Sequence, residues 1–218
     1  MDLLEIIKTR RSIRQFQDKQ VSLETIKKLI GAAVYAPSGC NKQDWRFIVI
    51  TEQRIKDKIT NMGGSALIKQ APLGILVLYS NQTKNIEYRG DIQSASAAIE
   101  NLLLAAHYYG LGACWVCHLP PKRQLRRLFN IPHYLSPVAY VLLGYAQTRP
   151  VDVPRKYKLE QIISFNAFSK NQLVERISPI KVFALKALIK IYYLIPLFIR
   201  KKWLNRFSDR YLVKKFRN

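Results

Sequence analysis

Acidic residues are scarce in this sequence. Its 218 residues include 14 Asp and Glu against 36 Lys and Arg, which gives a formal net charge of +22. Such an imbalance favours an anionic partner: nucleic acid, a negatively charged membrane surface or a phosphate-bearing ligand. The total charge does not choose among these three.

Cysteine is also scarce, since the chain has only three. This small, odd number excludes a disulfide framework and favours a reducing compartment. The first residues include Asp2 and Glu5, where a secretory signal would be basic. The longest apolar run, Ile191–Ile199, contains Pro196 and is far shorter than the roughly 20 residues of a spanning helix. We therefore expect a cytoplasmic protein.

Motifs for several other chemistries are missing. A glycine-rich dinucleotide loop is absent, so any nicotinamide cofactor would bind transiently and not on a domain of its own. The histidines lack ligand spacing, and we predict no metal site. Cys114 and Cys117 form a C-x-x-C, but on the strand expected there positions i and i+3 face opposite sides. A redox or metal pair is therefore not expected.

The composition is sufficient for a folded core, because 49% of the residues are hydrophobic. About half of the net positive charge is concentrated in residues 170–218, where the only acids are Glu175 and Asp209. We expect one domain over 1–169 and a basic, apolar extension over 170–218.

Apolar spacing over the first domain predicts an α+β fold. Ser22 can cap one helix, and a run of β-branched and aliphatic residues after Pro72 predicts a strand buried on both faces. The expected helices are 3–7, 22–36, 53–62, 91–110 and 124–130, and the expected strands are 46–52, 74–80, 113–119 and 138–146. Together they predict a central sheet of about four strands, flanked by helices.

Four stretches of the sequence, taken in their order along the chain, resemble those of a known family. They are RRSIRQF from Arg10, APSGCNKQDWRFIVI from Ala36, DIQSASAAIENLLLAAHYYGLGACWV from Asp91, and VLLGYAQTRPVDVPRKYKLEQII from Val141. In this order the chain resembles the nitroreductase family of FMN-dependent oxidoreductases. The resemblance covers residues 1–165. It implies an α+β fold with a central mixed, mainly antiparallel sheet, and an intimate homodimer with each flavin at the interface.

The resemblance assigns the arginine cluster to FMN. FMN carries a dianionic phosphate, and its ring becomes anionic at N1 on two-electron reduction, so cations are needed at both ends. Arg10, with Arg11 beside it, would bind the phosphate or ribityl chain, Ser12 would donate a hydrogen bond, and Arg14 would approach the N1/O2 edge. Taken alone, the stretch could also be a basic helix end on the surface.

Three further segments contain residues that the resemblance places in contact with FMN. The small polar loop would reach the flavin of the other subunit, the glycine-containing strand would lay backbone against the ring, and the late basic residues would complete the phosphate site. These residues are, in turn, Pro37, Ser38, Gly39, Asn41 and Gln43; Gly112, Ala113, Cys114 and Trp115; and Arg155, Lys156 and Lys158. The loop departs from the family pattern at Asp44, where proline is usual. Plain connections, a helix cap and a solvated basic loop are the alternative interpretations.

The implied reaction has two steps. NADH or NADPH would reduce FMN and leave, and an electron-poor small molecule such as a nitroaromatic or quinone would then be reduced in the same place. The alternative is a basic binding protein or membrane-associated accessory protein with a vestigial flavin site. Within the extension, residues 178–218 interleave apolar and basic residues. We expect this part to bind an anionic membrane surface or to pack on the dimer. A nucleic-acid partner is unlikely because no recognised motif is present.

Overall fold

The computed structural model describes residues 2–82, 87–148, 150–168 and 178–195. The chain divides into two compact units, Met1–Pro150 and Val151–Asn218. The boundary predicted between residues 169 and 170 falls outside the described residues.

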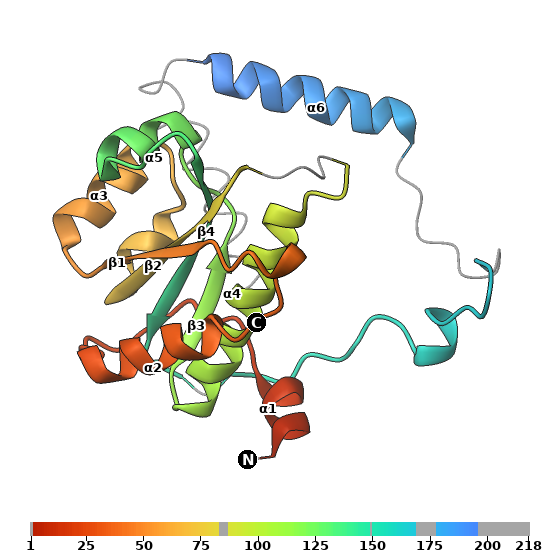
Figure 1. Cartoon of the computed structure of the whole chain (residues 1–218), viewed down its shortest axis with the longest axis horizontal. Coiled ribbons are helices and arrows are strands. Elements are labelled where there is room, and N and C mark those ends of the chain that lie inside the picture. The colour runs from red at the N-terminus through yellow and green to blue at the C-terminus, as the bar shows by residue number, and fades with distance from the viewer. Residues whose placement is uncertain (1, 83–86, 149, 169–177, 196–218) are drawn as a thin grey trace. The chain divides into compact units, whose positions relative to one another are not determined.

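The first unit combines helices with one four-stranded sheet of order β1-β2-β4-β3, in which every neighbouring pair is antiparallel (Figure 1). Its elements are α1 (Leu3–Thr9), α2 (Leu23–Ala33), η1 (Gly39–Asn41), β1 (Trp45–Ile50), α3 (Gln53–Asn61), η2 (Ala66–Lys69), β2 (Leu73–Ser80), α4 (Gly90–Tyr108), β3 (Gly112–Val116), α5 (Lys122–Phe129) and β4 (Leu135–Gly144). The second unit contains η3 (Leu159–Gln161) and α6 (Pro179–Leu194). The predicted α+β class and the four-stranded sheet are confirmed.

The sheet is buried on both faces because its central strands have apolar side chains at successive positions. Along β2, Ile75 and Val77 face α2 and α4, whereas Leu76 and Leu78 face α3, η2 and α5. Residues 73–80 are all buried, as the continuous apolar run predicted. The resulting unit has three layers, with helices on each side of one sheet.

Strand β4 begins earlier than the sequence predicted, and it contains Pro137. A proline cannot donate a ladder hydrogen bond, so an interior strand is an unfavourable place for it. The register between β2 and β4 shifts between Val77 and Leu78, so that Val77 pairs with Ala139 and Leu78 with Pro137. This bulge accommodates the proline in the middle of the sheet.

Strand β3 is shorter than predicted. The expectation of a strand to Leu119 is wrong beyond Val116, where β3 ends. Cys117 therefore lies past the strand and is exposed, while Cys114 within it is buried, and both are free thiols.

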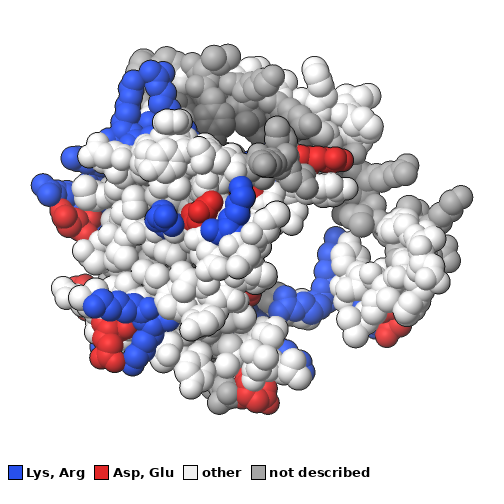
Figure 2. All heavy atoms as spheres, viewed as in Figure 1, with Lys and Arg blue, Asp and Glu red and all other residues white. Residues whose placement is uncertain are grey.

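Basic side chains are distributed over the surface. Figure 2 shows Lys and Arg at several separate places on the face in view, some of them beside acidic residues. Two of the ion pairs of the first unit join Lys28 to Glu24 and Lys69 to Asp57. The charge of the chain is thus not collected into a single stripe on this face.

Gly74 in β2 is a test of the packing between β2 and β4. A Cβ placed there would lie 1.9 Å from the hydroxyl of Tyr140, whose ring is fully buried and cannot swing away. We expect Gly74→Ala to lower the free energy of unfolding by about 1–3 kcal/mol, as other overpacked cores do. Urea denaturation followed by tryptophan fluorescence measures the loss.

Gly31→Ala is the matched control, because nothing lies within 4 Å of a Cβ at that position in α2. It should leave stability unchanged or raise it by about 0.5–1 kcal/mol, since alanine is the better helix residue. Equal effects of the two substitutions would contradict this account of Gly74.

Candidate functional site

The segment after α1 is held along the sheet by backbone hydrogen bonds. The amide of Ile13 donates to the carbonyl of Ala113 at 2.9 Å, and the amide of Gln17 donates to that of Tyr145 at 2.9 Å. Ser12 forms a parallel bridge with Ala113. This parallel bridge gives the antiparallel sheet its mixed character. The bridge joins the first of the four stretches to the third, and the hydrogen bond from Gln17 to Tyr145 holds the end of the first stretch beside the fourth.

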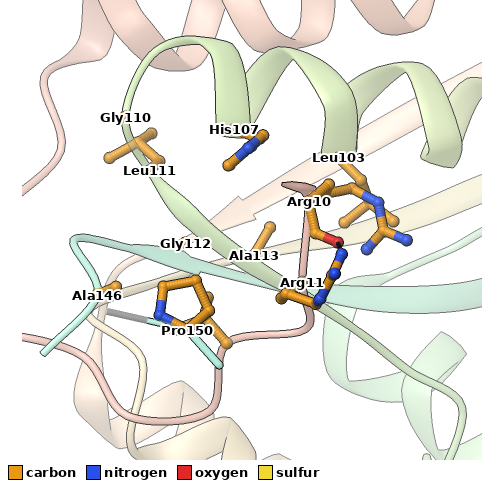
Figure 3. Close-up of a pocket in the computed structure, with 11 residues that line it drawn as sticks. Arg10, Arg11, Leu103, His107, Gly110, Leu111, Gly112, Ala113, Ala146 and Pro150 are labelled. Atoms are coloured by element: carbon orange, nitrogen blue, oxygen red, sulfur yellow. Dashed lines mark hydrogen bonds between the residues drawn. The ribbon is translucent and has the colours of Figure 1, made fainter. Parts of the chain in front are cut away.

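A pocket of about 240 Å³ lies where these segments meet the end of α4 (Figure 3). It combines two arginines and a histidine with small and aliphatic residues. The lining residues are Arg10, Arg11, Ile13, Leu103, His107, Gly110, Leu111, Gly112, Ala113, Ala146 and Pro150. A Cβ at Gly112 would lie 2.8 Å from Ile13, so only glycine allows the segment to approach this closely.

The two arginines of the pocket are positioned by their own surroundings. The Nε of Arg10 lies 3.5 Å from a carboxylate oxygen of Glu100 on α4. The Nη1 of Arg11 donates to the backbone carbonyls of Lys8, at 2.6 Å, and Arg10, at 2.8 Å. Both side chains also line the pocket, so their N–H groups can serve as charge-assisted donors to an anion.

His107 contributes a neutral imidazole to the same pocket. Its Nε2 lies 2.8 Å from the hydroxyl of Thr9, and that hydroxyl donates to the carbonyl of Glu5. The Thr9 oxygen must therefore accept, which places a proton on Nε2. Burial, followed by the charges of Arg10 and Arg11, lowers the pKa of His107 below its usual value.

The predicted arginine cluster is divided between two sides of its segment. Arg10 and Arg11 line the pocket, whereas Ser12 and Arg14 are not among the described residues that do. Burial raises the pKa of the Cys114 thiol on β3, and the charge of Arg14, a hydrogen bond from Ser12 and the charge of Arg10 oppose that rise. Trp115, the next residue of β3, is partly buried against the core layer of α2 and α4.

The small polar loop lies at the other end of α4. The amide of Gly39 donates to the hydroxyl of Ser94 at 3.0 Å, and the indole of Trp45 donates to the Ser94 carbonyl at 3.1 Å. Ser94 and His107 are separated along α4 by about 20 Å at 1.5 Å per residue. One chain therefore does not bring the loop and the arginine pocket together.

The loop has an unusual backbone. Cys40, Asn41 and Gln43 have φ values of 53°, 54° and 52°, in the left-handed region that non-glycine residues rarely adopt. The hydroxyl of Ser38 accepts from the amide of Gln43 at 3.1 Å and holds the turn. A proline at position 44 would restrict Gln43 to extended conformations, so Asp44 permits this geometry. Pro37 and Gly39 are exposed beside it.

The late basic residues belong to the second unit. Arg155, Lys156 and Lys158 are exposed, and the Nζ of Lys156 lies 5.0 Å from the centre of the Tyr157 ring. The amide of Lys158 donates to the side-chain Oε1 of Gln161 at 2.8 Å, at the start of η3. Their role at a phosphate stays a prediction.

Sequence reasoning missed several members of the pocket. No site role was predicted for His107, Leu103, Ala146 or Pro150. Leu103 and His107 are spaced i, i+4, which places both on one face of α4, and Gly110 follows the end of the helix. This shared face was the signal in the sequence that could have indicated these residues. The segment that packs against the face could not be inferred, because Arg10 to Ile13 lie far from α4 in the sequence.

Comparison with known proteins agrees with this architecture. A family model described as the nitroreductase family matches residues 7–67 and 60–145. The chain belongs to the nitroreductase family. A protein of Methanothermobacter thermautotrophicus, provisionally named NADH dehydrogenase/NAD(P)H nitroreductase, is 40% identical over 154 residues, covering 69% of this chain and 80% of its own.

Solved structures of nitroreductases have the same fold. An FMN-dependent nitroreductase of Clostridium difficile is 27% identical with a TM-score of 0.67, and the alignment covers 76% of this chain and 100% of that one. A provisionally named nitroreductase of Desulfovibrio desulfuricans, solved in complex with FMN, is 30% identical with a TM-score of 0.63 and is covered to 97%, against 76% of this chain. The nitroreductase-like fold is thereby confirmed.

The lowered pKa of His107 predicts a pH dependence of stability. In the unfolded chain the imidazole titrates near 6.5, whereas in the folded chain it binds a proton less readily. The unfolded state therefore holds more protons below about pH 7, and folding becomes less favourable as the pH falls through this range. In His107→Gln this contribution is absent, so its free energy of unfolding should fall less steeply between pH 7 and pH 5.

Urea denaturation at several pH values measures both slopes. His118→Gln removes an exposed imidazole outside the pocket and is the matched control. If His107→Gln retained the wild-type slope, neither burial nor the charges of Arg10 and Arg11 would lower the pKa of His107.

Proposed function

We propose that this protein is an FMN-dependent oxidoreductase that uses NADH or NADPH to reduce an electron-poor small molecule. The observation that carries the proposal is the positive pocket formed where the Arg10–Ile13 segment lies against β3 and the end of α4. Family membership and a relative solved with FMN support the cofactor. Relatives named NAD(P)H nitroreductase and FMN reductase support the electron donor.

The residues present fit the anionic end of FMN. Guanidinium groups bind phosphate oxygens with strong, directional hydrogen bonds, and Arg10 and Arg11 both line the pocket. The neighbouring wall is built from Gly110, Gly112 and Ala113, which permit a ligand to approach the backbone. A phosphate or ribityl chain would therefore find charge on one side and accessible main chain on the other.

The other residues predicted at the site would contact the flavin ring. When bound, FMN would supply the two-electron chemistry. Arg14, on the other side of the segment, would offer positive charge to the electron-rich edge of the ring, and Ser12 would donate a hydrogen bond. Backbone of Gly112, Ala113, Cys114 and Trp115 would lie along the ring. Donor and acceptor would use one opening in turn, so we expect ping-pong kinetics and a broad choice of acceptor.

A homodimer would complete the site. The pocket of one chain, at about 240 Å³, is smaller than the roughly 300–1,000 Å³ typical of ligand sites. The loop of Pro37, Ser38, Gly39, Asn41 and Gln43 lies at the far end of α4 and could reach a flavin only in a second copy. Exposed apolar residues on the first unit offer a surface for that copy, among them Leu4 at 63%, Tyr35 at 89% and Tyr108 at 56%.

We further propose a cytoplasmic enzyme that binds peripherally to the inner face of the membrane through residues 178–218. The basic composition of this extension supports an anionic surface as its partner. Among the described residues, no helix is both long and apolar enough to cross a bilayer.

An absorption spectrum of the purified protein tests the cofactor. We expect a yellow protein that is bleached under anaerobic conditions by NADH or NADPH and recoloured by an electron-poor acceptor. Arg10→Ala should weaken FMN binding about ten- to a hundredfold, because a charge-assisted contact to phosphate is lost. Fluorescence titration of the flavin-free protein with FMN measures the change.

Arg127→Ala is the matched control, since Arg127 is exposed on α5 and does not line the pocket. A colourless protein that fails to retain FMN supplied in excess would contradict the proposal. In that case the alternative of a basic binding protein or accessory protein with a vestigial flavin site would gain support, above all if a polyanion bound with steep salt dependence.

A further inference from the structure

Helix α6 presents a row of large apolar side chains to solvent. Ile180, Phe183, Leu188 and Ile191 are 80%, 75%, 60% and 54% exposed. Ala184 is exposed and Ala187 is partly exposed between them. A folded protein rarely leaves so many neighbouring apolar groups in water unless the surface has a partner.

These residues form one continuous stripe. Positions 180, 183, 184, 187, 188 and 191 follow the spacing i, i+3, i+4, i+7, i+8, i+11 that keeps residues on one helical face. At about 100° per residue they span an arc of about 140°. We call these six positions the α6 stripe.

One margin of the stripe is basic. Counted at the same 100° per residue, the exposed Lys181 falls about 20° beyond Leu188. The stripe itself contains no charged residue. A lysine at the margin of an apolar face can extend its stem along that face and reach the phosphate headgroups when the helix lies in the plane of a membrane.

Charge argues for lipid rather than for a second copy of this chain. The chain carries +22 overall, and Glu175 and Asp209 are the only acids from residue 170 onward. Two copies facing each other across this region would bring like charges together, whereas an anionic bilayer would attract them at roughly 1 kcal/mol for each lysine or arginine near the surface. The same stripe would bury its apolar groups at the level of the acyl chains.

We infer that the α6 stripe is the surface that binds an anionic phospholipid membrane, with the helix axis parallel to the bilayer. This deepens the peripheral association proposed above by naming the residues that enter the lipid. It does not require a bound flavin, because the stripe lies outside the residues that line the pocket.

Flotation of the full-length protein with vesicles tests the inference. The vesicles contain phosphatidylcholine with or without a minority of phosphatidylglycerol. We expect the wild type to float with the mixed vesicles and to remain behind with pure phosphatidylcholine. Phe183→Ser should weaken binding to the mixed vesicles about tenfold, because a large apolar side chain no longer leaves water. Replacing Ile180, Phe183, Leu188 and Ile191 together by serine should abolish flotation.

Leu159→Ser is the matched control. Leu159 is 65% exposed, close to the 60% of Leu188, and lies in the second unit but outside α6. This variant should float like the wild type. Flavin absorbance and the NAD(P)H-dependent reduction of a soluble acceptor, measured on the same samples, report the proposed enzyme separately. Loss of flotation with full activity is the expected pattern for the stripe variants.

Three results would overturn the inference. The stripe variants could float as well as the wild type, which would place membrane binding elsewhere or remove it. Sedimentation could show that they alter the oligomeric state while flotation is unchanged, which would make the stripe a contact between copies. Wild-type protein that failed to bind the mixed vesicles at all would exclude a lipid partner, whatever its activity.

Discussion

The site depends on a few backbone hydrogen bonds that hold the segment after α1 against the sheet. The amide of Ile13 bonds to Ala113 on β3, and the amide of Gln17 bonds to Tyr145 after β4. Without them, two arginines would project from a mobile helix end, where guanidinium groups are well hydrated and bind anions weakly. With them, Arg10 and Arg11 line the pocket at the end of α4. Gly112 has no side chain, and this allows Ile13 to pack closely against β3. Position, rather than the number of charges, makes these two arginines candidates for binding an anion.

The same constraint keeps two groups of residues proposed to bind the flavin apart within one chain. Helix α4 separates the arginine pocket from the loop around Asn41, and a rigid helix of 19 residues cannot bring its two ends together. The loop keeps three left-handed residues in place through Ser38 and Ser94, a strained arrangement that persists where surrounding contacts fix it. A second copy, with its own pocket beside this loop, is the simplest way to use both.

Much of the first unit could be predicted from local patterns. The continuous apolar run in β2, the cap at Ser22 and the long periodic helix from Asp91 each reflect a rule that acts within one element, and each was confirmed. The predictions were wrong where contacts with neighbouring strands set the ends of an element. The sequence predicted that β4 starts at residue 138, but it starts at Leu135, because the register shift beside Val77 and Leu78 accommodates Pro137. β3 ends at Val116, although the residues that follow, Cys117 to Leu119, would also suit a strand.

The sequence by itself determined the chemistry available to this protein: a cluster of arginines, a small polar loop, glycines before a strand, and a basic apolar extension. These are properties of composition and spacing, and they point to the nitroreductase family. Only the tertiary structure decided which of these groups meet. It placed Arg10 and Arg11 with His107, turned Ser12 and Arg14 toward Cys114, and left the loop at the other end of α4. Contacts between residues distant in the chain depend on packing and register, which no local pattern encodes.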